Sequence, residues 1–417
     1  MVTKLKYIKP RKGKDIMKSK VLFGQIIILI ILLTGFKSPT VKAEERDTSS
    51  DFVIVNGVLK KYKGSSKVVI IPDGVKEIGG GEFLANNGLN YNSTIKKVVI
   101  PDSVIKIGVA AFYMNSGLSE INIPDSVTII GPSAFGSCKS LTEIIIPKSV
   151  TTIDNSAFMN SGLSEINIPE SVTTIGGNAF LGTPWLDSKR ADAESGLVIV
   201  NNILIDARNA KGEVFVPEGV IKLADSGMSF SPITKVTLPK TLIEIGKGAF
   251  SACVNLKEVQ MKDNVAIIGD YAFEDCNSLE VLKLPKKLKE LGSLGLNSKV
   301  LKKFKTLEIP ASVEIISKDI LDSYSYDTGM LLIHENSPVY KYIKENNLTD
   351  VKYKVIDKEG KIEEETYMVV KVKKGDTLWK ISRKYLGKGT RFKEIMKLNN
   401  LKKTTIHVGQ KLKVPVK

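Results

Sequence analysis

Prolines and large apolar residues recur about every 23 residues along most of this 417-residue chain. The prolines stand mostly 22, 23 or 25 residues apart, with Lys262 in one vacant position; they are Pro72, Pro101, Pro124, Pro147, Pro169, Pro217, Pro239, Pro285 and Pro310. A large apolar residue follows each position at a constant offset of 11; these are Phe83, Phe112, Phe135, Phe158, Phe180, Met228, Phe250, Phe273, Leu296 and Leu321. A unit this short cannot bury its apolar face alone, so neighbouring units must stack.

The repeat unit is clearest from Leu118 to Phe135 and recurs at residues 141–158, 163–180 and 256–273. Its first part, LxxIxI, alternates apolar and polar residues before the proline, which indicates a strand with one buried face. One strand per unit predicts a parallel ladder. We therefore expect a β-solenoid of about 10 to 12 coils over residues 44–350.

Two segments interrupt this register in the same way. Val53 lies 19 residues before Pro72, and Val198 lies 19 residues before Pro217, each within a run of apolar residues that ends in asparagine. We interpret both as β-hairpins, the first capping the solenoid and the second, at residues 196–216, separating two sub-arrays. At the far end, a serine and proline at 337–338 and the apolar residues that follow predict a short capping helix over residues 337–348.

The three cysteines share one position in the repeat. Cys138, Cys253 and Cys276 each lie three residues after the repeat phenylalanine. A common register favours small buried thiols in the core over metal ligands or nucleophiles. We expect no disulfide, no metal and no cofactor.

The consensus IPxSVxxIGxxAFxxCxxLxxI resembles the leucine-rich repeat of the BspA-like surface proteins, and the resemblance covers most of the chain after residue 43. It implies an exported bacterial surface or secreted protein that adheres to host or matrix molecules through the solenoid. It does not imply a particular protein or matrix ligand.

One polar position of the repeat carries a carboxylate in four units. The residue before the middle apolar position of LxxIxI is Glu120, Glu143, Glu165 and Glu258. Stacked carboxylates repel one another, so such a column points to a cationic partner or a bound ion. A solvated polar face is the favoured alternative, because exposed charges on strands aid solubility.

The formal charge of +16 is concentrated at the two ends of the chain. Lys and Arg minus Asp and Glu gives 10 − 1 = +9 for residues 1–43, 36 − 42 = −6 for 44–365, and 15 − 2 = +13 for 366–417. Near the start, Lys18 and Lys20 precede an apolar run from Val21 to Leu33, typical of an export signal. We expect cleavage after Ala43, with Met17 as an alternative start.

The last 50 residues have a different pattern. After a charged linker at residues 351–366, the sequence predicts a βααβ unit over 367–416, with helical faces marked by Leu378, Ile381 and Tyr385 and by Phe392, Ile395 and Met396. The stretches YMVVKVKKGDTLWKISRKYLG, IMKLNNL and IHVGQKLKVP are similar to the LysM domain along its full length.

The LysM resemblance implies binding of N-acetylglucosamine glycans, chiefly peptidoglycan, in a groove between two loops. Those loops correspond here to Gly375, Asp376, Thr377, Leu378, Asn399, Asn400, Leu401 and Ile406. Amides and short polar groups suit an acetamido group, and the apolar side chains suit its methyl. The same glycines and polar residues also serve simply as turns and helix caps. Because a neutral glycan does not account for +13, we expect an anionic wall polymer as a further partner.

Two other functions have weaker support in the sequence. A wall hydrolase, or its regulator, tethered by the small domain has little support, because His334 and His407 stand in no metal-binding motif, although a carboxylate pair among 45 acids stays open. A nucleic-acid binder would use Trp379, Tyr385 and Phe392 for stacking, but we expect these in the core. The sequence therefore predicts an exported, cell-wall-associated adhesin-like binding protein, with no enzymatic activity and no nucleic-acid partner.

Overall fold

The computed structural model describes residues 51–79, 93–296, 300, 303–304, 306–323, 330–346, 348, 351, 353–363, 367–399 and 401–415. The predicted export signal at 1–43, Phe83 and Asn400 lie outside these residues. Two parts are described in turn: a solenoid of about 12 turns and a small C-terminal domain.

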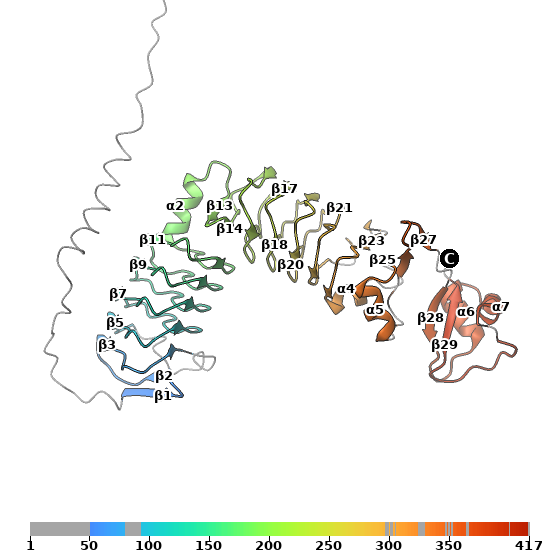
Figure 1. Cartoon of the computed structure of the whole chain (residues 1–417), viewed down its shortest axis with the longest axis horizontal. Helices are drawn as coiled ribbons and strands as arrows, with labels where there is room; N and C mark the ends of the chain where they lie inside the picture. Colours follow the sequence, from blue (N-terminus) through green and yellow to red (C-terminus); the bar gives the residue numbers. More distant parts are fainter. Residues whose placement is uncertain are drawn as a thin grey trace, which may run out of the picture. The chain divides into compact units, whose positions relative to one another are not determined.

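Each coil of the solenoid contributes a short strand after its proline, and these strands form a ladder in two arrays (Figure 1). The first array contains β1 (Phe52–Val55), β2 (Val58–Tyr62), β4 (Glu77–Ile78), β6 (Lys106–Ile107), β8 (Ile129–Ile130), β10 (Thr152–Ile153) and β12 (Thr174–Ile175). The second contains β13 (Val198–Val200), β14 (Ile203–Asp206), β16 (Lys222–Leu223), β18 (Glu244–Ile245), β20 (Ile267–Ile268), β22 (Glu290–Leu291) and β24 (Ile315–Ile316). Apart from the two hairpins, all neighbours within each array are parallel.

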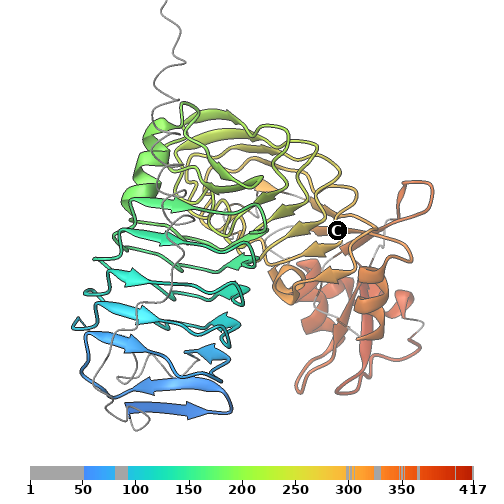
Figure 2. The same ribbon diagram turned by 60° about the vertical axis from the view of Figure 1, so that its left-hand side comes forward.

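The LxxIxI strands form a second ladder, so most coils carry two strands where the sequence predicted one. Its members are β3 (Val68–Ile70), β5 (Lys97–Val99), β7 (Glu120–Ile121), β9 (Glu143–Ile145), β11 (Glu165–Asn167), β15 (Gly212–Phe215), β17 (Ile233–Thr237), β19 (Glu258–Gln260), β21 (Val281–Leu282), β23 (Thr306–Ile309), β25 (Met330–His334) and β26 (Tyr353–Ile356). This ladder is divided into four sheets, with breaks between β7 and β9, between the two arrays, and between β21 and β23. Figure 2 shows the stacked coils of the first array.

The repeat phenylalanines form stacked columns inside the solenoid. In the first array, successive ring centroids from Phe112 to Phe180 lie 5.2, 5.2 and 5.6 Å apart, and Phe250 and Phe273 lie 5.3 Å apart. The main chain around each ring also joins the next coil, since the amide of Phe135 donates to the carbonyl of Ala157 at 2.7 Å. Residues two positions before and after the ring, such as Ser133 and Ser137, adopt left-handed φ values of 53° and 59°.

The serine and glycine of the repeat also have defined structural roles. The hydroxyl of Ser126 donates to the carbonyl of Val104 at 2.6 Å, and Ser149 bonds Val127 in the same way at 2.7 Å. A Cβ at Gly131 would lie 2.9 Å from the main-chain carbonyl carbon of Gly108 in the preceding coil. The close approach of neighbouring coils therefore requires glycine at this position.

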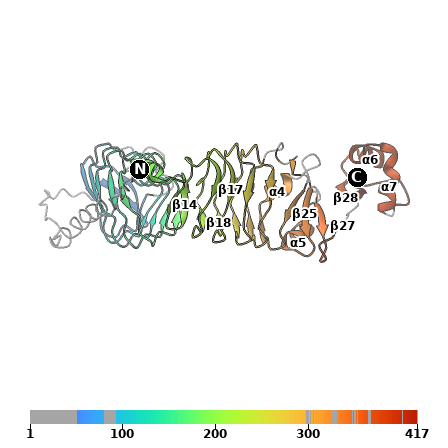
Figure 3. The same ribbon diagram turned by 90° about the horizontal axis from the view of Figure 1, so that it is seen from above.

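Antiparallel hairpins begin both arrays. β1 pairs with β2, and β13 pairs with β14, each with one irregularity in register. The second hairpin covers residues 198–206 of the predicted 196–216 segment, while β15 already belongs to the next coil. Helix α2 (Pro184–Asp192), capped by the side chain of Thr183, precedes it. Figure 3 labels β14 and β18, two strands of the second array.

The C-terminal end of the solenoid differs from the prediction. Helix α5 (Pro338–Glu345) begins at the predicted cap Ser337 and buries Val339 and Ile343, but Tyr342 is exposed. The helix does not end the ladder, because β26 pairs in parallel with β25 beyond it and turns back through β27 (Ile362–Glu363). The predicted charged linker at 351–366 is therefore wrong for residues 353–363. Helix α4 (Lys318–Ser323) lies between β24 and β25 in the chain.

The small domain contains two antiparallel strands and two helices. β28 (Tyr367–Lys371) pairs with β29 (Lys411–Pro415), with α6 (Leu378–Leu386), the 3-10 helix η2 (Gly389–Arg391) and α7 (Phe392–Leu398) between them. Its core includes Ile381, Leu386, Ile395 and Leu412. Across the described parts of both domains, no helix is both long enough and apolar enough to span a bilayer.

Candidate functional site

The two loops that the sequence predicted to form a binding groove lie at the same end of the small domain. Lys371 at the end of β28 pairs with Lys411 at the start of β29, so the loop after one strand meets the loop before the other. Val372 and Gln410 continue this contact through an amide-to-carbonyl bond of 2.8 Å. The side chains of Leu378, Leu401 and Ile406 belong to one apolar cluster that joins both loops.

The first loop is a tight turn that ends in a helix cap. The carboxylate of Asp376 accepts from the amide of Lys373 at 2.8 Å, and the hydroxyl of Thr377 accepts from the amide of Lys380 at 3.1 Å. Gly375 has a φ of +85°, and an added Cβ would meet no atom within 4 Å, so its Cα is open to an approaching molecule. Its carbonyl oxygen accepts from the Lys380 ammonium at 2.9 Å. Leu378 is only 2% exposed and lies in the core, which leaves little of its side chain for a ligand.

The side chain of Asn399 in the second loop is fully engaged within the domain. Its amide nitrogen donates to the carbonyl of Ile395 at 2.7 Å, and its amide oxygen accepts from the Lys413 amide at 2.6 Å. These bonds end α7 and attach it to β29. Leu401 and Ile406 are only partly buried. Asn400 lies outside the described residues, so five of the eight predicted residues offer an open Cα or accessible side chains: Gly375, Asp376, Thr377, Leu401 and Ile406.

Trp379 is an exposed surface residue, contrary to the prediction that places it in the core. It is 46% exposed, its ring covers Gly389, and the Arg383 guanidinium lies 5.3 Å from the ring centroid. The spacing of α6 already contained this signal. The buried residues Leu378, Ile381, Ser382 and Leu386 define one helical face, and Trp379 lies outside it. Tyr385 and Phe392 do pack against the core.

The small domain has almost no negative charge left to offset its basic residues. Of its two acids, Asp376 is used in the turn described above, and Glu394 forms a two-bond contact with Arg391 at 2.6 Å. The Arg391 hydrogen bonds lower the pKa of Glu394, which keeps this carboxylate ionised. The domain therefore presents an excess of exposed lysines.

Lysines lie beside two of the four predicted carboxylates. Glu120 forms an ion pair with Lys97 at 2.9 Å, and Glu258 lies 3.7 Å from Lys235 in the other array. Because Glu258 belongs to a different sheet from the other three, the four carboxylates do not form a single column. Glu143 and Glu165 do stand directly opposite each other in adjacent parallel strands, and both are exposed.

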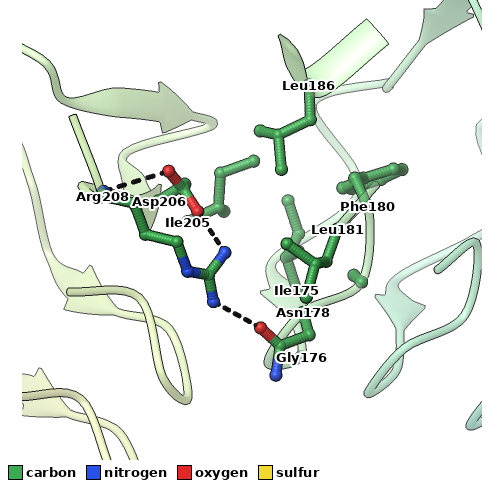
Figure 4. A pocket seen from close by; sticks show the side chains of 10 residues that line it. Ile175, Gly176, Asn178, Phe180, Leu181, Leu186, Ile205, Asp206 and Arg208 are labelled. Atoms are coloured by element: carbon green, nitrogen blue, oxygen red, sulfur yellow. Dashed lines mark hydrogen bonds and ion pairs between the residues drawn. The ribbon is translucent and has the colours of Figure 1, made fainter. Parts of the chain in front are cut away.

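A buried ionic network joins the two arrays of the solenoid. Asp206, 1% exposed, accepts from Arg190 at 2.7 and 2.8 Å and from Arg208 at 2.6 Å. Figure 4 shows Arg208 extending from Asp206 to the side-chain oxygen of Asn178 in the preceding array. The adjoining cavity of about 10 Å³ has room for roughly one water. The hydrogen bonds that Arg190 donates to Asp206 raise the pKa of Arg190, whereas burial lowers the pKa of Arg208.

The cysteines act as buried hydrogen-bond donors. The thiol of Cys138 contacts the carbonyl of Phe112 at 3.1 Å, and Cys253 and Cys276 reach Met228 and Phe250 in the same way. Burial raises the pKa of Cys138 and of Cys253 to about 12, so neither provides a thiolate near neutral pH. In the part of the chain that the structure describes, no group of three or more His, Cys, Asp or Glu residues is arranged to hold a metal.

Comparisons with known families match both parts of the chain. The BspA type leucine rich repeat region matches residues 85–193 and 212–327 in six copies, and the LysM domain matches residues 370–415. Fold and repeat together define a leucine-rich-repeat solenoid protein with a glycan-binding type of module. The chain belongs to the BspA type leucine rich repeat family. Both matched domains are of binding types, and no enzyme family is shown.

Several solved bacterial structures are similar to the chain at low identity. A leucine rich cell surface protein from Faecalibacterium prausnitzii is 22% identical, over 63% of this chain and 87% of that one, with a TM-score of 0.30. The pneumococcal vaccine antigen PcpA is 19% identical, over 72% and 95%, with a TM-score of 0.35. A leucine rich repeat protein from T. pallidum is 23% identical, over 53% of this chain and 82% of that one, with a TM-score of 0.27. Among curated proteins, none matches this chain.

Proposed function

We propose that this chain is an exported binding protein attached to the bacterial cell wall. The LysM domain holds an N-acetylglucosamine glycan of peptidoglycan, and the solenoid presents its surface to a protein or matrix partner. The match of the LysM domain over residues 370–415, with its two loops meeting at one end, is the observation that carries this proposal.

The open Cα of Gly375 and the accessible side chains of Leu401 and Ile406 suit an acetylated sugar. An acetamido group offers one donor, one acceptor and one methyl, so main-chain groups and an apolar contact are sufficient to hold it. Asn399 supports this groove from within the domain and does not contact the sugar through its side chain.

Sedimentation with insoluble peptidoglycan tests this attachment. The intact chain co-sediments with peptidoglycan, whereas a chain lacking residues 371–417 stays in solution. Unchanged co-sedimentation of the shortened chain would refute the assignment. Assay of the same mixture for released wall fragments separates the binding role from a hydrolase.

Excess lysines in the LysM domain add a long-range attraction to anionic wall polymers. Such an attraction weakens as salt screens it, because the Debye length falls from about 10 Å at 0.1 M to about 3 Å at 1 M. Compared with intact walls, walls stripped of their anionic polymers therefore retain less of the chain at low salt and the same amount at 1 M. If stripped and intact walls retain the same amount at low salt as well, this contribution is contradicted.

For the solenoid, the remaining acidic pair provides a defined test. Replacement of Glu143 and Glu165 by alanine weakens capture of a cationic partner if that pair contributes to the binding surface. Glu120→Ala serves as a control, because Lys97 already neutralises that carboxylate. Equal capture by all variants would remove the pair from the binding surface.

A further inference from the structure

One ladder of the solenoid lacks strand pairing at a point where the strands of the other ladder pair continuously. β20, β22 and β24 pair continuously, and the amide of Ile315 donates to the carbonyl of Lys289 at 3.1 Å. On the other ladder, one sheet ends at β21 and the next begins at β23. Among the described residues, no main-chain hydrogen bond joins these two strands. The coils thus stay joined on one side and separate on the other.

The repeat spacing changes at this break. Pro310 follows Pro285 by 25 residues, whereas Pro285 follows the equivalent Lys262 by 23. The LxxIxI strands β21 and β23 do not pair here, while the post-proline strands stay in register. Figure 1 shows β21 and β23 as successive strands of this ladder.

A groove of about 710 Å³ is lined by residues of both strands, by the turn after β23 and by Leu332 and His334 of β25. Its volume lies within the range of roughly 300 to 1,000 Å³ that is usual for ligand sites. Its floor is apolar and includes Leu282, Leu284 and Leu307, which point inward. Its rim is polar and includes Lys283, Lys286 and Glu308. Apolar floor and polar rim alternate along both strands, as they do in the rest of the ladder.

The charges on the rim are unequal. Glu308 forms a hydrogen bond with the imidazole of His334 at 3.0 Å and contributes one negative charge. Among the described residues, no ion-pair or hydrogen-bond partner reaches the ammonium groups of Lys283 and Lys286, and both side chains are exposed. The net charge of Lys283, Lys286 and Glu308 is therefore positive.

We infer that this groove receives an extended peptide segment of a partner protein, added as a strand between β21 and β23. Two facing strand edges without partners provide main-chain donors and acceptors, which is the usual basis of recognition by strand addition. Because successive side chains of a strand point to opposite faces, the segment alternates apolar residues over the leucine floor with acidic residues beside Lys283 and Lys286. The inference deepens the proposed binding role of the solenoid and rests on it.

Fluorescence anisotropy with the full chain tests this inference. The probe is a labelled peptide of about nine residues that alternates valine and glutamate, long enough to extend beyond both ends of a short strand. A valine–lysine peptide and a valine–glutamate peptide with methylated main-chain nitrogens on alternate residues are the controls. The first control changes the charge, and the second prevents hydrogen bonding of the main chain.

We expect the valine–glutamate peptide to bind and both control peptides to bind at least tenfold more weakly. Ala311→Trp, which fills the groove from an exposed position, and the double variant Lys283→Glu/Lys286→Glu each weaken binding at least tenfold. Lys240→Glu makes the same type of charge change at the position equivalent to Lys286 two coils earlier, and leaves binding unchanged.

Absence of binding by the valine–glutamate peptide, or equal binding by the N-methylated peptide, overturns the inference. So does a charge-reversed double variant that binds normally. Because the assay contains no peptidoglycan, any of these results leaves attachment through the LysM domain untouched, and failure of peptidoglycan sedimentation leaves the groove untouched.

Discussion

At the scale of single residues, the position three after each repeat phenylalanine shows how the coils are joined. Cys138, Cys253 and Cys276 donate there to a carbonyl of the preceding coil, and Ser231 does so through its hydroxyl at 2.7 Å. Ser161 occupies the same position, but its buried hydroxyl has no hydrogen-bond partner. Where the hydroxyl of a serine is too short to reach a carbonyl of the preceding coil, the longer thiol of a cysteine forms this hydrogen bond.

Ser161→Cys is expected to stabilise the first array by about 1 kcal/mol, because it removes an unsatisfied hydroxyl from the core and supplies a donor that reaches the preceding coil. The midpoint of urea unfolding measures the change. Cys138→Ser, the reverse substitution one coil earlier, should lower the midpoint by a similar amount. A lower midpoint for Ser161→Cys contradicts this role for the position.

The same burial predicts thiol reactivity. With a folded pKa of about 12 against an ordinary value of 9.0, Cys138 and Cys253 stay protonated and unreactive at pH 8.5. Because the folded pKa is the higher one, the stabilising effect of each neutral thiol is complete below pH 9 and is lost as the pH rises toward 12. A thiol-specific colour reagent should detect three thiols in denaturant and none rapidly in the native chain.

At the scale of secondary-structure elements, the network around Asp206 joins α2, β14 and the last coil of the first array. Both arginines are held against a carboxylate that is almost completely buried. Loss of that carboxylate charge leaves two cations facing each other with much less compensation. The junction between the two arrays is therefore sensitive to the replacement of one carboxylate oxygen of Asp206 by an amide nitrogen.

Asp206→Asn is expected to destabilise the chain by about 3 kcal/mol, since breaking a buried ion pair leaves its partner uncompensated. Asp187→Asn removes an exposed partner of the same Arg190 and should cost less than about 0.5 kcal/mol. Thermal unfolding of both variants measures the difference. Equal effects would show that the network does not hold the arrays together.

Much of the solenoid was predictable at this scale because stacking places the same residue in the same contact in every coil. Phe135 and Phe158 reveal their column through spacing alone. The two-residue strands such as Thr152–Ile153 are too short for alternation to be visible, so the second ladder was missed. Ser137 and its equivalents adopt left-handed φ values, but they include Met114, Phe230 and Ala252, so residue type gives no consistent signal. The groove at β21 depends on which strands pair between coils, which no local pattern contains.

In the LysM domain, the sequence predicted which loops meet but not what each side chain does there. Leu378 and Asn399 are used by the fold itself, one in the core and one in hydrogen bonds to Ile395 and Lys413. A motif gives the position of a residue and not the direction of its side chain. Counting the helical face would nevertheless have identified Trp379 as exposed.

At the scale of the whole molecule, the two proposed binding roles fall on two parts with separate hydrophobic cores. Stacked coils give the solenoid a long surface. In the proposed attachment, one LysM domain gives limited affinity for glycan, because avidity normally comes from several copies. The basic charge of residues 366–417 would then add a long-range attraction to an anionic wall.

Titration of the intact chain with a soluble N-acetylglucosamine tetramer, followed by main-chain amide chemical shifts, tests wall attachment through the LysM loops most directly. We expect shifts at Gly375, Asp376, Thr377, Leu401 and Ile406, with the solenoid amides unchanged. Absence of shifts in these loops, or shifts confined to the solenoid, would contradict the assignment of glycan binding to this domain.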